Sequence, residues 1–384
     1  MEDAVAKFLN QLDESRKKKE PLSKGVDTGY AELDSKTCGL QRGELIVIGS
    51  RVSMGKTSLA LNIAKNVSSV DNQCVLYFSL EMSSEQLINR IMTMASKVDG
   101  EYIRSGSISD NEWEKIIDAA NSIGNARLIV DDTPGNAVES INDTCRACRE
   151  KYGVDLVIID YLQLITTKKA YERRQEVVAA IVGTLKMLAK ELNIPVVVLS
   201  QISRDADKRD DHRPILADFR EGAAVEEDAD TVIFIYRDDY YNKDSAHKNI
   251  AEIILAKQTN GRCGTVYLNW NPRFCLFDNY YEDRPKTADL SKIVDTVCGE
   301  YGIDKESLLS KKRTSEIVLA RQTIMYLCRE YTDMSLEEIG KAVGSRDHTV
   351  VMSGISKIKS RISSDDELGE RIGRLSQRML SISD

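Results

Sequence analysis

The sequence predicts an α/β fold followed by a small, wholly helical domain. Short apolar runs, each ending in small or acidic residues, alternate with longer stretches of helical periodicity. Strands buried on both faces have such continuous apolar runs, so the alternation indicates a parallel sheet covered by helices on both sides. After residue 286 the strand pattern ends and only helical periodicity remains. We therefore expect a parallel-sheet core with helices on both faces, plus a small all-α domain.

Eight apolar runs are expected to form strands. They are residues 44–49, 74–81, 126–132, 155–161, 194–201, 231–237, 251–258 and 264–270. Residues 57–67 and 176–192 have apolar positions at helical spacing and are predicted to be helices between strands. The charged, proline-containing stretch 283–286 is predicted to be a linker. The expected domains are thus an amphipathic helix over 1–24, a sheet domain over 25–283 and a helical domain over 289–384.

The composition is that of an ordinary globular protein, with 42% hydrophobic and 30% charged residues among 384. No apolar run reaches the roughly 18 residues of a membrane span, and the amino terminus lacks a signal peptide's apolar core. Among eight cysteines, the close pair Cys145 and Cys148 has no second pair to complete a zinc site. We therefore expect a cytoplasmic protein with reduced thiols and no membrane partner.

Charge is unevenly distributed along the chain. The net charge of -8 argues against a generally basic surface that would coat nucleic acid. Between Lys311 and Arg361, however, 10 basic residues stand against 6 acidic ones. This local excess of positive charge is small, and it indicates contact with nucleic-acid phosphates only if the same segment also contains a DNA-binding motif.

A phosphate-binding loop is predicted where the first strand meets the first long helix. The sequence ELIVIGSRVSMGKTSLAL places Gly-Lys-Thr at the turn, although Ser50 stands where the usual pattern begins with glycine. Backbone amides of such a loop converge on phosphate oxygens at a helix amino terminus. The lysine would reach the terminal phosphates, and the threonine hydroxyl would hold Mg²⁺. The expected nucleotide contacts are Ser53, Met54, Gly55, Lys56, Thr57 and Ser58.

Three further polar residues end predicted strands at the same sheet edge. Asp160 could hold Mg²⁺ through water, and Glu81 could polarise an attacking water. Gln201 is the third. A single strand-end carboxylate is most often merely solvated, but three such endings beside a Gly-Lys-Thr helix favour a nucleotide hydrolase.

Motif after motif, the first domain resembles the motor domain of DnaB-type replicative helicases, which has a RecA-like fold. The matching segments, from about Ala4 to Phe277, are VDTGYAELDSKTCGLQRGELIVIGSRVSMGKTSLALNIA, FSLEM, DLVIIDYLQLI, LSQISR, DFREGAAVEEDAD and AKQTNG. The resemblance implies that Lys56 and Thr57 bind ATP and Mg²⁺. It also implies that Glu81 is the catalytic carboxylate, Asp160 the Walker B acid and Gln201 the phosphate sensor.

The resemblance further implies a bacterial or phage-encoded homohexamer that moves 5′–3′ on single-stranded DNA, with a primase, loader or initiator as candidate partners. The segment before residue 24 is similar to the family's linker helix, which docks on the neighbouring subunit. The expected single-stranded DNA contacts are Arg220, Glu221 and Gly222. A basic cluster lies where the resemblance places another channel loop, and it consists of Lys168, Lys169, Arg173 and Arg174. The solvated start of a helix would explain this cluster equally well.

The sequence departs from the family at its arginine finger. The family has an arginine two residues after the lysine retained here as Lys257, and in this chain that position is Thr259. An arginine finger accelerates hydrolysis by roughly 10³ to 10⁵ in NTPases. Arg262 lies close by, so we expect Lys257 and Arg262 to serve catalysis. Val52 also replaces a proline of the phosphate loop, and the family's helical amino-terminal collar has no counterpart in the sequence.

The helical domain is predicted to contain a helix-turn-helix, with its turn at Gly344. KRTSEIVLARQTIMYLCREYTDMSLEEIGKAVGSRDHTVVMSGISKI resembles the DNA-binding domain of DnaA initiators, over about Asp289 to Lys359. The resemblance implies base contacts from the start of the second helix, a minor-groove arginine and several phosphate contacts. The expected double-stranded DNA contacts are Arg313, Arg321, Arg329, Lys341, Arg346, Asp347, His348 and Thr349.

The last residues predict one amphipathic helix through Leu368, Ile372, Leu375 and Leu380, which either packs on the helical domain or binds a partner. Two functions stay open for the whole chain. The first is an ATP-dependent replicative helicase that carries its own origin-type DNA-recognition domain. The second is an ATP-binding initiator or helicase-recruiting switch without processive unwinding, favoured by Thr259 and the missing collar. A RecA-like recombinase is less favoured, because LSQISR and DFREGAAVEEDAD match the helicase pattern.

Overall fold

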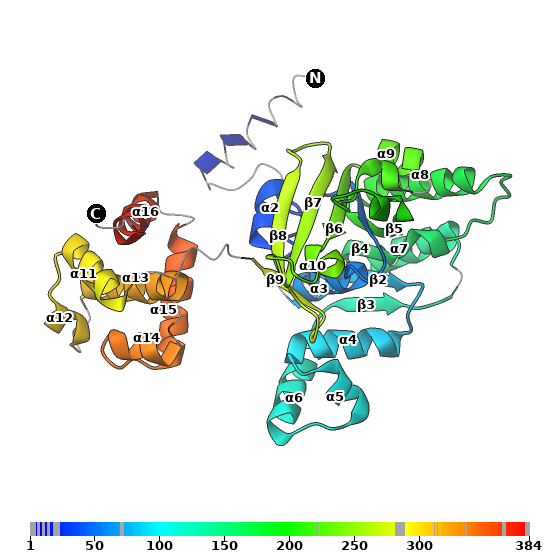
Figure 1. Cartoon of the computed structure of the whole chain (residues 1–384). Helices are drawn as coiled ribbons and strands as arrows, with labels where there is room; N and C mark the ends of the chain where they lie inside the picture. Colours follow the sequence, from blue (N-terminus) through cyan, green and yellow to red (C-terminus); the bar gives the residue numbers. More distant parts are fainter. Residues whose placement is uncertain are drawn as a thin grey trace. The chain divides into compact units, whose positions relative to one another are not determined.

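The computed structural model divides the chain into two compact units, Met1–Tyr280 and Tyr281–Asp384, which we describe separately (Figure 1). It describes the chain except for residues 1–4, 6–7, 10–11, 14–15, 18–23, 70–72, 135, 220–221, 281–288, 311, 313, 333, 335, 363–365 and 381–384. The predicted linker at 283–286 lies outside the described residues. No helix in the described part of the chain is long and apolar enough to cross a membrane.

The first unit is built on one nine-stranded sheet, in the order β3-β2-β4-β5-β1-β6-β7-β8-β9. The strands are β1 (Leu45–Ser50), β2 (Cys74–Ser79), β3 (Leu128–Asp131), β4 (Val154–Asp160), β5 (Val196–Gln201), β6 (Thr231–Tyr236), β7 (Ile250–Gln258), β8 (Gly264–Asn271) and β9 (Leu276–Asn279). The six strands from β3 to β6 in this order run parallel, which confirms the predicted core. β7 pairs antiparallel with β6, β8 with β7, and β9 with β8. The turns 259–263 and 272–275, which join β7 to β8 and β8 to β9, are too short for the crossover that parallel pairing requires.

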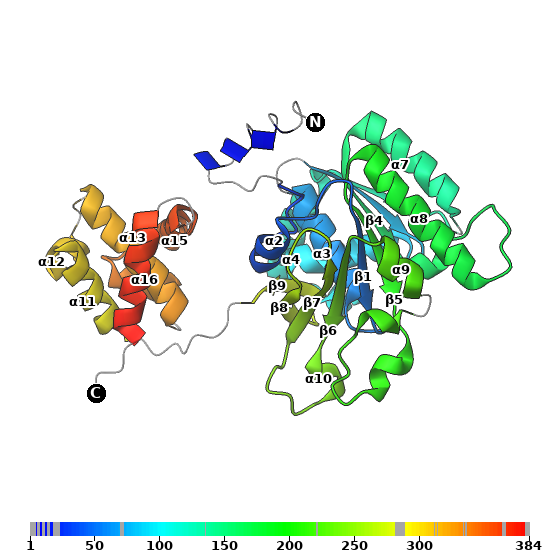
Figure 2. The same ribbon diagram turned by 90° about the horizontal axis from the view of Figure 1, so that it is seen from above.

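Helices cover both faces of the sheet (Figure 2). They are α2 (Ala31–Thr37), α3 (Lys56–Ser69), α4 (Ser84–Ser96), α5 (Gly100–Ser105), α6 (Asp110–Gly124), α7 (Val138–Tyr152), α8 (Arg174–Leu192), α9 (Gly222–Asp228) and α10 (Asp238–Tyr241). Side chains of one strand alternate between the two cores. Ile46 and Ile48 pack with α2 and α3, whereas Leu45 and Val47 pack with α7 and α8. The central strands bury apolar side chains on both faces, so burial on either side fixes their register.

The carboxyl ends of the parallel strands meet at one edge of the sheet. There Ser50, which ends β1, pairs with Gln201, which ends β5. On the neighbouring pair, Ser79 of β2 lies beside Asp160 of β4. A ligand of a doubly covered sheet binds at this edge, and the fold therefore brings the predicted strand-end residues together.

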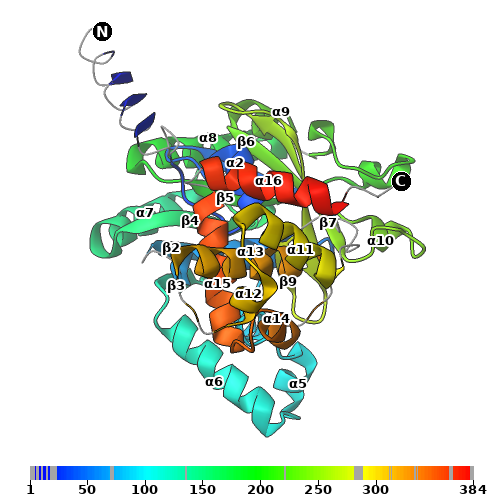
Figure 3. The ribbon, with the colours of Figure 1, turned by 90° about the vertical axis from the view of Figure 1, so that its left-hand side faces the viewer.

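In its described residues the second unit contains helices and no strand (Figure 3). Its helices are α11 (Leu290–Tyr301), α12 (Lys305–Leu309), α13 (Ser315–Tyr331), α14 (Leu336–Ala342), α15 (His348–Ile362) and α16 (Asp366–Leu380). In α16, Leu368, Ile372 and Leu375 are buried in the core of this unit, where the helix contacts α11 and α15. The sequence left open whether this helix packs on the helical domain or binds a partner. The burial of these residues shows that it packs on the helical domain.

A tight turn joins α14 to α15. Gly344 has a φ of 93°, and a Cβ there would lie 2.6 Å from the carbonyl oxygen of Leu309. The turn therefore requires glycine. Val351 and Ile358 of α15 are buried, whereas Val350 is 49% exposed. Adjacent residues of a helix point about 100° apart, so α15 cannot bury both valines against one core.

Candidate nucleotide and nucleic-acid sites

A cavity of about 390 Å³ opens beside the loop between β1 and α3. Most of the predicted nucleotide-site residues line it, namely Ser53, Gly55, Lys56, Thr57, Ser58, Glu81 and Gln201. Met54 differs from the expectation, since its side chain is 1% exposed and belongs to the apolar core beneath the loop. An apolar side chain at this point anchors the loop, and only its backbone is left for a ligand.

The loop curves sharply before α3 begins at Lys56. Gly55 has a φ of 98°, and a Cβ there would lie 2.9 Å from the ring of Phe277. Only glycine satisfies both restrictions, whereas Val52, which replaces the family's proline, is 56% exposed and constrains nothing. The loop leads directly into the amino terminus of α3, where unpaired backbone N–H groups and the helix dipole favour an anion.

Lys56 lies between two carboxylates and an aromatic ring. Its Nζ stands 4.5 Å from the ring centroid of Tyr161. Burial lowers the pKa of Lys56, whereas the charges of Asp160 and Glu81 act to raise it. The ammonium group is thus partly desolvated and faces the cavity, which strengthens its attraction for an anionic ligand.

Asp160 supplies a buried carboxylate with one oxygen unused. The residue is 2% exposed, and its Oδ2 accepts a hydrogen bond from the Tyr77 hydroxyl at 3.2 Å. Its Oδ1 has no hydrogen-bond partner in the described part of the chain. Buried polar atoms are rarely left unpaired, and a hydrated cation would satisfy this one. Within the described residues no group of three acids, histidines or cysteines could hold a metal alone. The site therefore fits Mg²⁺ held largely by phosphate and water.

The end of β5 is fixed by a residue that the sequence did not single out. Gln163 follows β4, and its Nε2 donates to Ser200 Oγ at 3.1 Å and to the carbonyl of Gln201 at 3.3 Å. Its Oε1 accepts from the backbone N–H of Gln201 at 3.2 Å. Gln163 thus ties the ends of β4 and β5 together and orients Gln201 toward the cavity.

The sequence analysis did not single out six further lining residues, namely Arg51, Met82, Arg90, Tyr161, Trp270 and Cys275. Trp270 is 7% exposed, its indole N–H has no partner among the described residues, and its ring lies 5.2 Å from the Arg237 guanidinium. It stands on β8, so only the antiparallel extension of the sheet brings it near the phosphate loop. No local motif signals such a contact.

Lys257 and Arg262 lie at the opposite edge of the sheet. Both β1 and β7 pair with β6, so positions along β6 give the separation between them. Ser50, at the end of β1 that leads into the phosphate loop, pairs with Ile235. Gln258, which follows Lys257 on β7, pairs with Thr231. These positions are four residues apart, roughly 13 Å at about 3.3 Å per residue, and Arg262 lies beyond them in the β7–β8 turn. The structure therefore does not bring Lys257 or Arg262 to the cavity of the same chain.

The neighbours of these residues are defined. Lys257 Nζ donates to the carbonyls of Glu226 at 2.5 Å and Glu227 at 3.2 Å, near the end of α9. Thr259, at the position of the family's finger, donates its hydroxyl to the carbonyl of Asp230 at 3.1 Å. Arg262 is exposed, so its guanidinium is accessible to another chain.

The predicted single-stranded DNA loops are only partly visible. Arg220 and Glu221 lie outside the described residues, and Gly222 begins α9. All four residues of the basic cluster between β4 and α8 are exposed, namely Lys168, Lys169, Arg173 and Arg174. Arg174 also donates to the carbonyl of Gln163 at 3.0 Å, which connects this cluster to the edge that carries Gln201.

The second unit exposes part of the predicted DNA surface. Arg329, Lys341 and Asp347 are exposed, and Arg346 is half-buried and donates to the carbonyl of Ser310 at 2.9 Å. Arg313 and the side chains of His348 and Thr349 lie outside what the structure describes.

Arg321 differs from the predicted phosphate contact. The residue is 5% exposed, and its guanidinium donates to four backbone carbonyls, two within α12 and two after it. The acceptors are Leu308 at 2.6 Å, Lys312 at 2.6 Å, Ser310 at 2.6 Å and Ser307 at 3.0 Å. Burial, and after it the charge of Arg346, lowers the pKa of Arg321. We therefore assign Arg321 to stabilising the α12–α13 connection.

We expect Arg321→Ala to destabilise the second unit by about 3 kcal/mol, because the buried carbonyl of Leu308 would lose its donor, at a cost of about 1–3 kcal/mol, whereas water can reach the other three part-buried carbonyls. Hydrogen exchange of the full chain should show faster exchange over residues 289–362 and unchanged exchange over 25–279. Arg329→Ala is the matched control, since Arg329 is an exposed residue of the same helix and surface changes shift stability by about 0.5 kcal/mol at most. Equal exchange in both variants would restore Arg321 as a DNA-contact candidate.

Known protein families match both units. Residues 25–279 match the DnaB-like helicase C-terminal domain, and residues 290–358 match the helix-turn-helix of the bacterial DnaA protein. The replicative DNA helicase DnaB of Geobacillus stearothermophilus is 46% identical over 256 residues, which cover 66% of this chain and 56% of that protein. The replicative DNA helicase DnaC of Bacillus subtilis (strain 168) is 40% identical over 280 residues, 73% of this chain and 62% of that protein. The chain thus spans less than two thirds of the length of these two relatives.

Solved structures agree with the fold. One solved ATPase domain matches with a TM-score of 0.69 and 36% identity, covering 73% of this chain and 98% of that one. The structure of a DnaB-like replicative helicase and its interactions with primase matches with a TM-score of 0.68 and 35% identity, covering 73% and 67%. The predicted RecA-like core is confirmed. Because the helicase domain match spans well over half of the 384 residues, the chain belongs to the DnaB-like helicase family, with a DnaA-like helix-turn-helix fused after the motor domain.

Proposed function

We propose that the protein is an ATP-dependent replicative DNA helicase whose DnaA-like unit recognises double-stranded DNA of its own. The observation that carries the proposal is the cavity in which Lys56, Glu81 and Gln201 converge. The buried Asp160 does not line this cavity, but its charge acts on Lys56, and its Oδ1 has no partner among the described residues. These groups come from four separate segments, and a phosphate ester with its cation is the ligand that uses all of them.

Each residue has a chemical role in this proposal. The triphosphate would lie at the amino terminus of α3, where Lys56 binds the terminal phosphates. The Thr57 hydroxyl, and Asp160 through water, would hold Mg²⁺, which neutralises charge on the phosphates. Glu81 is exposed at the cavity and would polarise the attacking water. Gln201 would contact the terminal phosphate and report its loss to the strand-end loops.

The position of Lys257 and Arg262 supports assembly into a ring. Because they lie at the edge opposite the cavity, they can serve catalysis only at a neighbouring copy. The amphipathic segment before residue 24 exposes Val5, Phe8, Leu9 and Leu12, between 43% and 56% each, and such a stripe needs a partner surface. We propose a homohexamer, with residues 168–174 and 220–222 contacting single-stranded DNA. A primase, a loader and an initiator are candidate partners. One similar solved structure is of a DnaB-like replicative helicase and its interactions with primase.

The second unit would hold the motor at its loading site. Arg329 and Lys341 would contact phosphates, and Asp347 directly precedes α15, the helix that would enter the major groove. Tethering a motor beside its duplex site raises its local concentration without new contacts.

Thr259 favours a second function, an ATP-binding initiator or helicase-recruiting switch. Its hydroxyl is engaged with Asp230 and carries no charge for a neighbour's phosphates. In that case the protein would bind ATP and DNA without processive unwinding.

The test is ATP turnover by the purified chain with and without single-stranded DNA, alongside unwinding of a forked substrate. For the helicase we expect several-fold stimulation by single-stranded DNA and strand displacement that requires Mg²⁺. ATP binding without stimulation and without displacement would instead establish the switch. Absence of both binding and turnover would refute either function.

A further inference from the structure

The turn between β7 and β8 carries Arg262 and is tied to its own unit at its first two residues. Thr259 donates its backbone N–H at 3.0 Å and its hydroxyl at 3.1 Å to the carbonyl of Asp230. Asn260 Nδ2 donates to Glu44 Oε1 at 2.9 Å. Arg262 is exposed and makes no hydrogen bond or ion pair with the described residues. The bond from Asn260 is therefore the last contact of the turn before the arginine.

Glu44 is a buried carboxylate that directly precedes β1. It is 8% exposed, and its Oε2 accepts a hydrogen bond from the Thr231 hydroxyl at 3.3 Å. The pKa of Glu44 is raised, because burial raises it more than the hydrogen bond from Asn260 lowers it, and the charge of Asp230 also raises it. A desolvated carboxylate needs hydrogen-bond donors, and Asn260 supplies the shorter of these two bonds.

Asp230 adds a second carboxylate to this cluster. Its Oδ2 accepts from the backbone N–H of Leu45 at 2.7 Å and pairs with the ammonium group of Lys186 on α8. The side chains of Lys186 and Asp230 are 17% and 16% exposed, so the cluster is shielded from water. Glu44 and Asp230 thus share the charge of Lys186. Such a site favours a neutral donor, like the Asn260 amide, and disfavours a third carboxylate.

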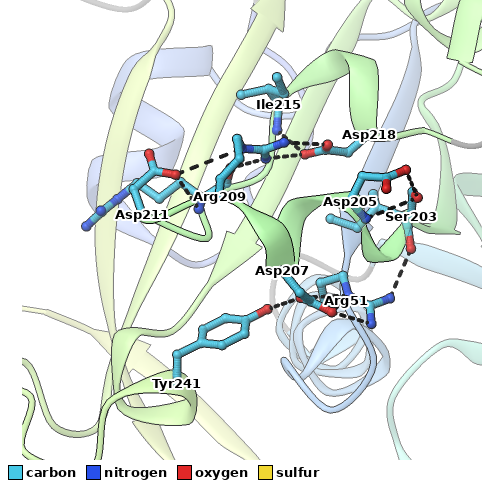
Figure 4. A network of polar contacts seen from close by, with 11 residues as sticks. Arg51, Ser203, Asp205, Asp207, Arg209, Asp211, Ile215, Asp218 and Tyr241 are labelled. Atoms are coloured by element: carbon cyan, nitrogen blue, oxygen red, sulfur yellow. Dashed lines mark hydrogen bonds and ion pairs between the residues drawn. The ribbon is translucent and has the colours of Figure 1, made fainter.

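The opposite end of β1 is anchored as well. Arg51 directly follows the strand, and its Nη2 lies 2.8 Å from Oδ2 of Asp207, whose Oδ1 accepts from the Tyr241 hydroxyl at 2.7 Å (Figure 4). One strand therefore has the phosphate loop at its carboxyl end and the turn with Arg262 at its amino end. Because both ends of the strand are fixed, the Glu44 carboxylate gives the turn a defined position on its unit.

We propose that Asn260, held by the carboxylate of Glu44, is a positioning residue for Arg262, which acts on the nucleotide of a neighbouring chain. The inference rests on the proposed function. Two residues of extended chain span about 7 Å, so a turn released from Glu44 lets the arginine move by several ångströms. A displacement of about 1 Å can already cost a reacting group about 10²-fold in rate. An arginine without partners in its own chain depends on such an anchor.

The test uses Asn260→Asp in the full chain, which keeps the shape of the side chain and sets a third carboxylate against Glu44 and Asp230. ATP turnover is measured at concentrations where sedimentation shows the assembly, and nucleotide binding is measured separately. We expect turnover to fall by about 10²-fold with binding retained. Glu44→Gln combined with Asn260→Asp exchanges the donor and the acceptor. This double variant should recover turnover by about tenfold or more, within the range of coupling between residues in contact.

Mixing shows on which chain Asn260 acts. Chains with Asn260→Asp keep their own nucleotide cavity, so turnover should return when they are mixed with Lys56→Ala chains, whose Arg262 is correctly placed. Mixing with Arg262→Ala chains should restore nothing, because neither chain then supplies a correctly placed Arg262. In assemblies shown to be mixed, recovery with Arg262→Ala chains, or none with Lys56→Ala chains, would overturn the positioning role.

Asn242→Asp is the matched control. Asn242 is an exposed asparagine between α10 and β7, and its Oδ1 accepts from the backbone of Asp244 at 3.0 Å, as an aspartate can. Turnover in this variant should stay within about twofold of the wild type. Equal losses in both variants, or wild-type turnover in Asn260→Asp, would refute the inference.

A second variant guards against misfolding of the first. Should Asn260→Asp fail to fold, Asn260→Ala removes only the 2.9 Å bond to Glu44 and must lower turnover and show the same pattern in the two mixtures. Failure of the proposed function is distinguishable, because the wild type itself would then show no turnover. A wild type that hydrolyses ATP, beside Asn260 variants that do so equally well, refutes this inference alone.

Discussion

Glu81→Gln should lower ATP turnover by about 10²- to 10⁴-fold while leaving ATP binding intact, because a positioned general base contributes about that much. Glu81 lines the cavity and is exposed there, within electrostatic reach of Lys56 and Tyr161. Glutamine keeps the size and hydrogen-bonding capacity of the side chain but cannot accept a proton from water. Turnover is measured under saturating ATP and Mg²⁺, and binding is measured separately with a fluorescent nucleotide.

The matched control is Glu85→Gln, an exposed acid in the first turn of α4 that does not line the cavity. It should leave turnover within about twofold, since a surface substitution removes no contact with the phosphates. If the Glu81→Gln variant hydrolyses ATP at the wild-type rate, another group must act as the general base. Loss of nucleotide binding in that variant would show that Glu81 supports the loop and not the chemistry.

The parallel core and the strand-end residues could be predicted because both depend on local sequence. Apolar runs of five to eight residues define buried strands, and Asp160 and Gln201 end such runs. In a parallel sheet all strand ends of one direction meet at one edge, so residues far apart in sequence converge without further information. The Gly-Lys-Thr turn then specifies what that edge binds.

Residues whose role depends on long-range packing were not predictable in the same way. Trp270 reaches the cavity only because β7, β8 and β9 extend the sheet in antiparallel order. Arg321 has the appearance of a DNA-binding arginine in the sequence, yet the short α12 places four carbonyls around its guanidinium. Asp207 is one of several acids in a charged loop, and only the fold selects it as the partner of Arg51.

Arg262→Ala should reduce ATP turnover by about 10³-fold in assembled protein, the lower end of the effect of arginine fingers in NTPases. Arg262 is an exposed cation in the β7–β8 turn, and Thr259 supplies no charge at the family's finger position. We therefore expect Arg262 of a neighbouring chain to stabilise the charge that develops on the transferred phosphate. Turnover is measured at concentrations where sedimentation shows the assembly, and Arg273→Ala, an exposed arginine of the β8–β9 turn, is the control.

Mixing experiments decide whether Arg262 acts on its own chain or on the next one. Chains with Lys56→Ala and chains with Arg262→Ala are each expected to be inactive alone. If the finger acts between chains, a mixed assembly contains junctions where an intact Lys56 meets an intact Arg262, and turnover returns. If both residues served the same chain, no mixture could regain activity. Because the two residues stand at opposite edges of one sheet, we expect recovery on mixing, and its absence in assemblies shown to be mixed would remove Arg262 from the shared site.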